Sequence, residues 1–294
     1  MRREFTRLEF LRVGAAGAAL WAARAGWAES GSRPSGGEGA GGRHVPVGLQ
    51  LYSVRAECAK DLPTVLAAVA AMGYQGVEFA GYHGRSAAEL RRMLDGSGLA
   101  CCGTHLAIDA LTGDELERTV EFNRDLGNRF LVVASLPEGW MADRERCQAT
   151  AWTFNEVSEK VAAAGMRVGY HNHAGDLRLV DGETAWDIFF SQARPEVVMQ
   201  LDTANTLAGG GDPVQILGKH PGRAATMHLK EHSRSTPAAV LGEGDVDWRA
   251  LFDAVEAQGA TDWYIVEHEG DGLPPLVAVE RCLANLRKIT GEGS

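Results

Sequence analysis

The feature that most constrains the fold is a regular alternation of short apolar runs with longer segments of helical periodicity, from residue 47 to the C-terminal region. The apolar runs predict strands at 47–52, 75–80, 99–105, 129–134, 167–171, 197–202, 225–229 and 263–267. The helices predicted between them lie at 61–72, 86–96, 114–126, 143–165, 184–192, 213–219, 247–258 and 275–288. In the first of these helices, apolar residues such as Leu62, Val65 and Val69 recur at spacings of three and four, which places them on one face.

Eight strand–helix units in roughly 250 residues predict one α/β domain, a (β/α)8 TIM barrel over residues 46–290. A doubly wound open sheet is the alternative. It is disfavoured because no glycine-rich phosphate-binding fingerprint follows the first strand. The three glycines at 209–211 follow the sixth strand without that spacing and are interpreted as a loop.

The first 28 residues have the pattern of an export signal. Arg2, Arg3, Arg7 and Arg12 precede a short apolar run, and small residues follow it. The run is shorter than the ~20 apolar residues that an ordinary transmembrane helix needs. The stretch resembles a twin-arginine signal in which Leu8 replaces the second arginine. We therefore expect export to the periplasm, with an uncleaved amphipathic N-terminus as the alternative.

Residues 29–45 are predicted to be a flexible linker, because six of the twelve residues at 31–42 are glycine. The whole chain has a formal charge of −10, and residues 29–294 have 24 basic and 37 acidic side chains, a charge of −13. Such a charge repels a phosphate backbone, so we expect no nucleic-acid partner. The five cysteines lack the spacing of a zinc ribbon or a disulfide framework.

Polar residues gather where the predicted strands end. In a barrel the carboxyl ends of the strands meet on one face, which holds the chemistry. The residues placed there are Glu78, His105, His171, His173, Asp202, Asn205, His228, Lys230, Glu267 and Glu269. Any one of them could be an ordinary hydrogen-bonded residue. Histidines and carboxylates from four successive strands, however, suit a divalent cation, and burying them without one would be costly.

The sequence resembles the sugar phosphate isomerase/epimerase group of xylose isomerase-like TIM barrels, which also includes endonuclease IV. The resemblance covers roughly residues 46–290. It rests on the segments VGLQLYSVR, GYQGVEFAG, VGYHNHAGDL, QLDTANTLAGG, MHLKEH, LGEGDVDW and WYIVEHEG. It implies one catalytic divalent metal ion, taken as Mn, Zn, Co or Fe, with Mg as a further option.

The metal ligands that the resemblance implies are His171, Asp202, His228 and Glu267. His105 matches a histidine that in relatives faces the substrate or a further metal. Asn205 stands where endonuclease IV has another metal-binding histidine, so the multi-zinc cluster of that enzyme is incomplete here. DNA repair is therefore disfavoured.

One departure from the family bears on mechanism. Ketose epimerases of this group use a glutamate on the fifth strand and another on the eighth as paired acid and base. Here the fifth strand offers His171 and leaves Glu267 as the single carboxylate of that pair. The residues expected to act in catalysis are Glu267, His105, Glu78 and Lys230. Those expected to bind substrate are His173, Asn205, Glu243 and Tyr52.

Three functions remain open at this point. The first is a metal-dependent sugar or keto-sugar isomerase or epimerase that abstracts an α-proton and stabilises an enediolate. The second is a metal-dependent lyase or dehydratase acting on a 3-keto-glycoside or a keto-inositol. The third is a carbohydrate-binding barrel without turnover. In each case the partner is a small sugar or polyol, and the protein is a monomer or a homodimer without stable membrane insertion once the signal is removed.

Overall fold

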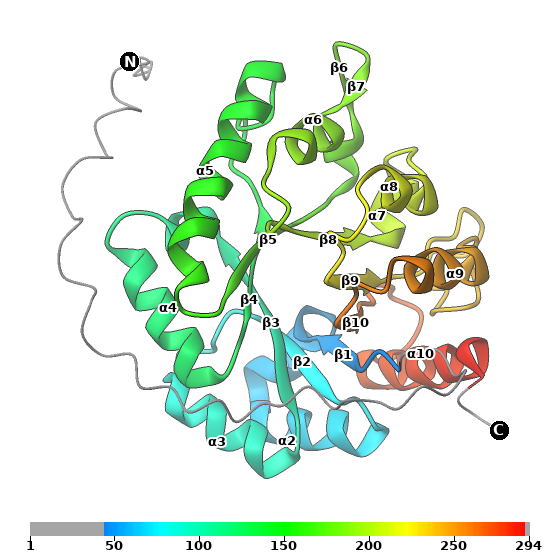
Figure 1. The fold of residues 1–294 in the computed structure, drawn as a ribbon. Coiled ribbons are helices and arrows are strands. Elements are labelled where there is room, and N and C mark those ends of the chain that lie inside the picture. The colour runs from blue at the N-terminus through cyan, green and yellow to red at the C-terminus, as the bar shows by residue number, and fades with distance from the viewer. Residues whose placement is uncertain (1–43, 292–294) are drawn as a thin grey trace, which may run out of the picture. The chain divides into compact units, whose positions relative to one another are not determined.

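The computed structural model describes residues 44–291, so the expected export signal and most of the expected linker lie outside the described residues. Eight parallel strands form a closed barrel in the order β1-β10-β9-β8-β5-β4-β3-β2 (Figure 1). They are β1 (Val47–Gln50), β2 (Gly76–Ala80), β3 (Ala100–Ala107), β4 (Phe130–Ser135), β5 (Arg167–His171), β8 (Val198–Asp202), β9 (Thr226–Leu229) and β10 (Trp263–Val266). The predicted single-domain (β/α)8 barrel is confirmed.

Helices surround the barrel, as Figure 1 shows. They are α2 (Arg55–Met72), α3 (Ala87–Ser97), α4 (Glu115–Leu126), α5 (Arg144–Ala162), α6 (Ala185–Gln192), α7 (Thr203–Ala208), α8 (Pro213–Lys219), α9 (Trp248–Gln258) and α10 (Pro275–Thr290). The short α7 was not predicted from the sequence. Single 3-10 turns follow β1, β3 and β5, and a small hairpin of β6 (Leu179–Val180) and β7 (Glu183–Thr184) precedes α6.

Local signals account for the helix ends. Ser86 and Glu89 form a reciprocal capping box at the start of α3, and Gly98 ends that helix in the left-handed conformation at φ 70°. Helix α2 begins before the predicted residue 61. Asp61 nevertheless leaves the helical conformation (φ −155°) and caps the following turn by accepting hydrogen bonds from Thr64. The predicted start is therefore the start of the second part of α2.

The barrel interior changes from apolar to polar along the strands. Side chains two residues apart on a strand face the same side, so Val198, Gln200 and Asp202 share one face. A separate apolar cluster lies near the starts of strands β4, β8, β9 and β10. It contains Phe130, Val132, Val198 and Ala225, with Trp263 packed on it. This cluster fills the amino-terminal end of the barrel, which leaves the carboxyl-terminal end to the polar side chains.

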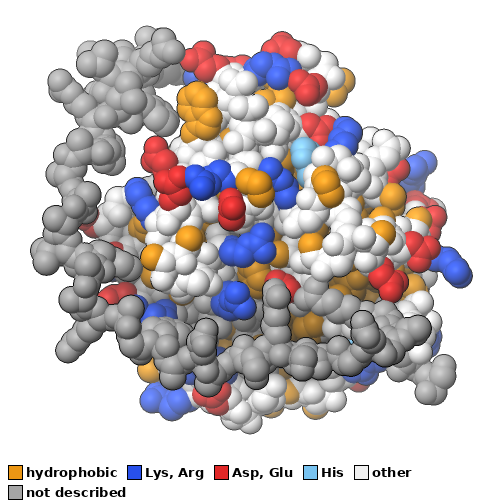
Figure 2. Space-filling model, viewed as in Figure 1, with side chains coloured by type: hydrophobic (Ala, Val, Ile, Leu, Met, Phe, Trp, Pro, Cys, Tyr) orange, Lys and Arg blue, Asp and Glu red, His pale blue; other side chains and the backbone are white. Residues whose placement is uncertain are grey.

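The surface carries charges of both signs. On the face shown in Figure 2, lysine and arginine side chains are interspersed with aspartate and glutamate. Among residues 44–291, no helix combines the length and apolar character needed to cross a membrane.

Glycines inside the barrel make room for neighbouring side chains, which gives a test of the packing. A Cβ added at Gly48 of β1 would lie 2.5 Å from the Sγ of buried Cys102, whereas one added at Gly96 of α3 would meet nothing within 4 Å. We expect Gly48→Ala to lower the free energy of unfolding by about 1–3 kcal/mol through overpacking. The matched control Gly96→Ala should be neutral or stabilising by about 0.5–1 kcal/mol. Urea unfolding of both variants measures the difference, and equal stabilities would contradict the packing described.

Candidate metal centre and active site

Four buried side chains meet at the carboxyl-terminal end of the barrel. They are His171 of β5, Asp202 of β8, His228 of β9 and Glu267, the residue after β10, and one potential ligand atom from each lies within 4.8 Å of all the others. Strand register brings them together, since Asp202 pairs with His228 in the ladder between β8 and β9. The structure thus assembles the four residues that the family resemblance suggested as metal ligands.

Two atoms of this group have no hydrogen-bond partner. His171 Nδ1 and Asp202 Oδ2 are both buried and make no hydrogen bond within the described part of the chain, although Asp202 Oδ2 lies 3.9 Å from His228 Nδ1. Burial lowers the pKa of His171 well below its usual value, so its imidazole is neutral. Burial raises the pKa of Asp202 to about 6, although Lys230 opposes this. A neutral imidazole and a carboxylate oxygen without donors are the lone pairs that a divalent cation uses.

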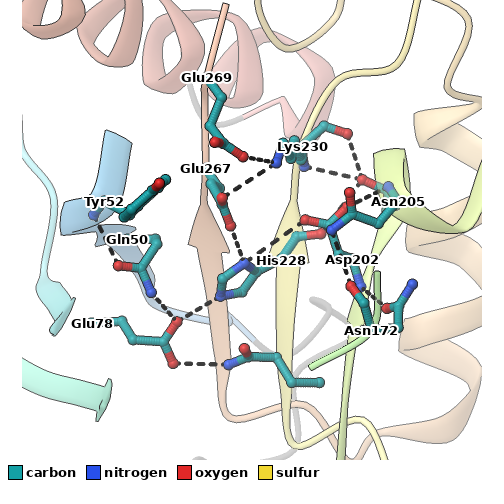
Figure 3. A network of polar contacts seen from close by, with 12 residues as sticks. Gln50, Tyr52, Glu78, Asn172, Asp202, Asn205, His228, Lys230, Glu267 and Glu269 are labelled. Atoms are coloured by element: carbon teal, nitrogen blue, oxygen red, sulfur yellow. Dashed lines mark hydrogen bonds and ion pairs between the residues drawn. The ribbon is translucent and has the colours of Figure 1, made fainter. Parts of the chain in front are cut away.

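His228 lies between two carboxylates. Its Nδ1 is 2.6 Å from Glu267 Oε2 and its Nε2 is 2.6 Å from Glu78 Oε2 (Figure 3). Burial alone would lower the pKa of His228, but the two carboxylates outweigh this and raise it to about 10. Without a cation, His228 is therefore an imidazolium that neutralises part of the acidic charge around it.

Glu78 is completely buried, and both oxygens of its carboxylate accept hydrogen bonds from neighbouring side chains. Gln50 and Gln200 each donate an amide hydrogen to its carboxylate at 2.8 Å, and His105 Nε2 is 3.1 Å away. Gly103 provides the room, because a Cβ there would collide with the Glu78 carboxylate. Glu78 was predicted to be catalytic. Its geometry instead suits orienting His228, since a carboxylate on the far nitrogen of a ligating histidine fixes the ring and its tautomer.

His105 reaches the centre from β3 and is partly exposed. Its Nε2 is 2.7 Å from the amide oxygen of Gln200 and 3.1 Å from Glu78. Both partners are acceptors, so Nε2 carries the proton and Nδ1 keeps a lone pair. The His105 ring lies 4.9 Å from that of His171 and 5.1 Å from that of His228. This position suits His105 for proton transfer at the centre.

Lys230 supplies a cation at the mouth of the barrel. Its Nζ lies 3.3 Å from Glu267 Oε1 and also contacts Glu269 (Figure 3). Burial would lower the pKa of Lys230, but these carboxylates together with Asp202 raise it above its usual value. Lys230 therefore holds its proton and acts as a fixed positive charge, which makes it a poor proton acceptor.

The four predicted substrate-binding residues lie in different settings. The His173 ring is 5.0 Å from that of His171, and exposed Tyr52 lies above Gln50, to which its backbone N–H donates. Asn205 forms hydrogen bonds within the protein. Its backbone N–H donates to Asp202 Oδ1, and its side-chain amide donates to the backbone carbonyl of Asn172. Glu243 pairs with Arg281 and Asn285 of α10. The structure does not bring Glu243 to the four-residue group.

Sequence reasoning missed two residues that build the site, Gln50 and Gln200, which hold Glu78. Asn172 lies at a strand end as the sequence predicts, and it accepts a hydrogen bond from the Asp202 backbone at 2.7 Å. The signal for the two glutamines was present, since each is a buried amide within an otherwise apolar strand. An unpaired amide in such a place is costly, so it predicts a polar partner inside the barrel.

Comparisons with known proteins agree with this architecture. Residues 66–289 match the family described as xylose isomerase-like TIM barrel, and the chain belongs to that family. Its relatives include the rhizopine catabolism protein MocC of Rhizobium meliloti, 28% identical over 68% of this chain and 72% of the relative. An inosose dehydratase of Geobacillus thermodenitrificans is 24% identical over 69% of this chain and 80% of the relative.

A solved structure of a sugar phosphate isomerase/epimerase from Parabacteroides distasonis is also similar, with 26% identity and a TM-score of 0.70. The similarity covers 83% of this chain and 98% of the other. Relatives of this kind are enzymes that act on small sugars or polyols.

The first prediction from the site concerns the metal. Asp202→Asn keeps the side-chain volume and the oxygen that caps α7 but removes the negative charge. We expect it to weaken binding of Mn²⁺ or Zn²⁺ at least about tenfold, because a carboxylate ligand is lost. Titration calorimetry and metal analysis measure this, with Glu243→Gln as the control that should bind like the wild type. Wild-type protein that takes up neither metal would contradict the site.

A second prediction separates positioning from catalysis at Glu78. Glu78→Gln keeps a hydrogen-bond partner for His228 but loses the charge. Loss of such a supporting carboxylate typically lowers metal affinity by about 10–100-fold, and we expect a decrease in that range by calorimetry. If Glu78→Gln bound Mn²⁺ as tightly as Glu243→Gln, the positioning role would be wrong.

Proposed function

We propose that the protein is a divalent-metal-dependent lyase that eliminates water from a neutral keto-sugar or keto-cyclitol. The observation that carries this proposal is the unlike pair of proton-transfer groups at the centre. In the four-residue group β5 contributes His171 and the end of β10 contributes Glu267, so only one of these two positions is a carboxylate, and the ring of His105 faces the same group. A carboxylate base and an imidazole acid suit α-proton removal followed by expulsion of a hydroxyl group.

His171, Asp202, His228 and Glu267 would hold the metal ion, since two of them offer unpaired buried atoms. When bound, the ion polarises the carbonyl oxygen of the substrate and stabilises the negative charge that develops on it. Lys230 adds a second fixed positive charge close by. Its ammonium is already oriented by Glu267 and Glu269, so little reorganisation is needed during the reaction.

The proton transfers follow from the geometry. Glu267 takes the α-proton, and the electrons of the broken C–H bond form an enolate with the adjacent carbonyl. The enolate re-forms the carbonyl and expels the β-hydroxyl group, to which His105 gives the proton on Nδ1 that it has taken from solvent. The products are an unsaturated ketone and water, and the proton on Glu267 returns to solvent.

Several further observations support dehydration of a neutral substrate. The inosose dehydratase relative is named for a dehydration, and the related protein MocC for rhizopine catabolism. The lysine at the mouth is matched by two carboxylates, so its charge is not available to a phosphate. Export, which residues 1–28 predict, would place the enzyme where sugars are mostly not phosphorylated.

Isomerisation or epimerisation of a keto-sugar is the second candidate. It is favoured by the similarity to the Parabacteroides distasonis isomerase/epimerase structure. The same Glu267 and His105 would then return the proton to carbon, and the carbon skeleton would keep its full set of hydroxyl groups. The first step is shared, so the two candidates differ only in the fate of the enolate.

Incubation with keto-inositols and 3-keto-glycosides in heavy water tests this proposal. With Mn²⁺ or Co²⁺ present, we expect mass spectrometry to show loss of one water molecule from a keto-inositol. A 3-keto-glycoside carries the glycosidic oxygen on its β-carbon, so the same elimination should release the aglycone alcohol from it. Glu267→Gln should reduce the rate by about 10²–10⁴-fold because the base is lost, whereas Glu243→Gln should react normally. Deuterium uptake with an unchanged molecular formula would favour the isomerase. Neither exchange nor elimination on any of these ketones would overturn the enzyme proposal in favour of a binding barrel.

A further inference from the structure

A cavity of about 260 Å³ lies beside the metal centre, between the segment that follows β9 and the segment that follows β10. Its walls are formed by Lys230, Glu231, Pro237, Ala239, His268, Glu269 and Gly270. Pockets that hold a whole small-molecule ligand typically have volumes of about 300–1,000 Å³. The cavity is therefore sized for one part of a ligand, such as a single ring.

The cavity adjoins the catalytic group at Lys230. This residue lines the cavity, and its ammonium lies 3.3 Å from Glu267 Oε1. Glu269, which also contacts Lys230, lines the cavity as well. A substrate whose reacting carbons lie at Glu267 would place its next substituent against these two side chains.

The charges of the walls exclude a phosphate. The positive charge of Lys230 is matched by Glu267 and Glu269. The carboxylate of Glu231 faces inward to its own loop, where it accepts hydrogen bonds from the backbone of Gly242 and the indole of Trp248. The walls are thus polar with no surplus cation, a composition that suits hydroxyl groups, which both donate and accept.

His268 provides a second, independent indication of a ligand. Its side chain is 93% buried, being 7% exposed, and its Nε2 makes no hydrogen bond of normal geometry with the described residues. A buried imidazole nitrogen without a good partner costs free energy unless a ligand or water completes it.

The walls are also closely packed. A Cβ added at Gly270 would lie 2.9 Å from the His268 ring, and one added at Gly272 would collide with Ala238 on the opposite segment. The two segments therefore meet directly, with glycines at the contacts, and hold the cavity in a fixed shape.

We propose that this cavity is a subsite for a neutral, hydroxylated ring attached to the reacting sugar, so that the preferred substrate has two rings. The ring's hydroxyl groups are recognised by Glu269, Lys230 and the imidazole of His268. This inference rests on the proposed function for the position of the reacting ring. It adds the place of the second ring, and among the candidate substrates it favours glycosides over free monosaccharides.

Binding of unreactive sugars to the full chain tests the subsite without requiring turnover. The probes are glucose, cellobiose, lactose and glucose 1-phosphate, measured by titration calorimetry in the presence of Mn²⁺. We expect at least one disaccharide to bind about tenfold more tightly than glucose, the effect of one or two net hydrogen bonds. Glucose 1-phosphate should bind no more tightly than glucose, because the one lysine in the walls already pairs with two carboxylates.

Variants assign that preference to the cavity. His268→Phe keeps the ring volume and Glu269→Gln keeps the side-chain length of an exposed residue, and each should remove most of the disaccharide preference. Asp271→Asn is the matched control, because it changes an acidic residue of the same loop that does not line the cavity. Equal affinities for glucose and both disaccharides, or a preference retained in both cavity variants, would overturn the subsite.

The two proposals fail in different ways. If the elimination reaction were wrong, the disaccharide preference and its loss in His268→Phe would still be measured. If the subsite were wrong, elimination from a monocyclic ketone in heavy water would still occur, with rates unchanged in His268→Phe.

Discussion

The arrangement of the site depends on one buried interaction, the histidine of β9 held between two carboxylates. His228 contacts Glu78 on one nitrogen and Glu267 on the other, all three almost completely buried. Removing His228 would leave the two carboxylates without the cation they share, and removal of one partner from a buried ion pair typically costs about 3–5 kcal/mol. The orientation of the His228 ring is therefore fixed, close to His171 Nδ1 and Asp202 Oδ2, which make no hydrogen bond within the described residues.

The barrel offsets the cost of burying these charges by separating its interior into an apolar end and a polar end. Aromatic and aliphatic side chains, including Trp263, fill the end where the strands begin. The end where the strands finish is left to polar groups, and Gln50 and Gln200 bridge from the strand interior to Glu78. Gly76 and Gly103 leave space for Trp263 and for the Glu78 carboxylate. A Cβ at either position would displace the layer above or below it.

The proposed chemistry uses the asymmetry of the centre. A carboxylate just after β10 with an imidazole on β3 would give two proton-transfer groups of unlike basicity, whereas two glutamates would give like ones. Lys230, fixed between Glu267 and Glu269, supplies charge stabilisation without acting as a base. The neighbouring cavity, with no surplus cation and one incompletely bonded imidazole, extends the site toward a neutral second ring.

The sequence by itself determined the eight strand–helix units and the polar residues at the strand ends, because the periods of strands and helices are local properties of the chain. It also predicted His171, Asp202, His228 and Glu267 through the family resemblance, and the structure brings them together. The partners of Glu78 and of Glu243 became visible only in the tertiary structure. A residue's partners 28 to 150 positions away depend on strand register and barrel closure. Those are set by packing of the whole domain, which no local pattern contains.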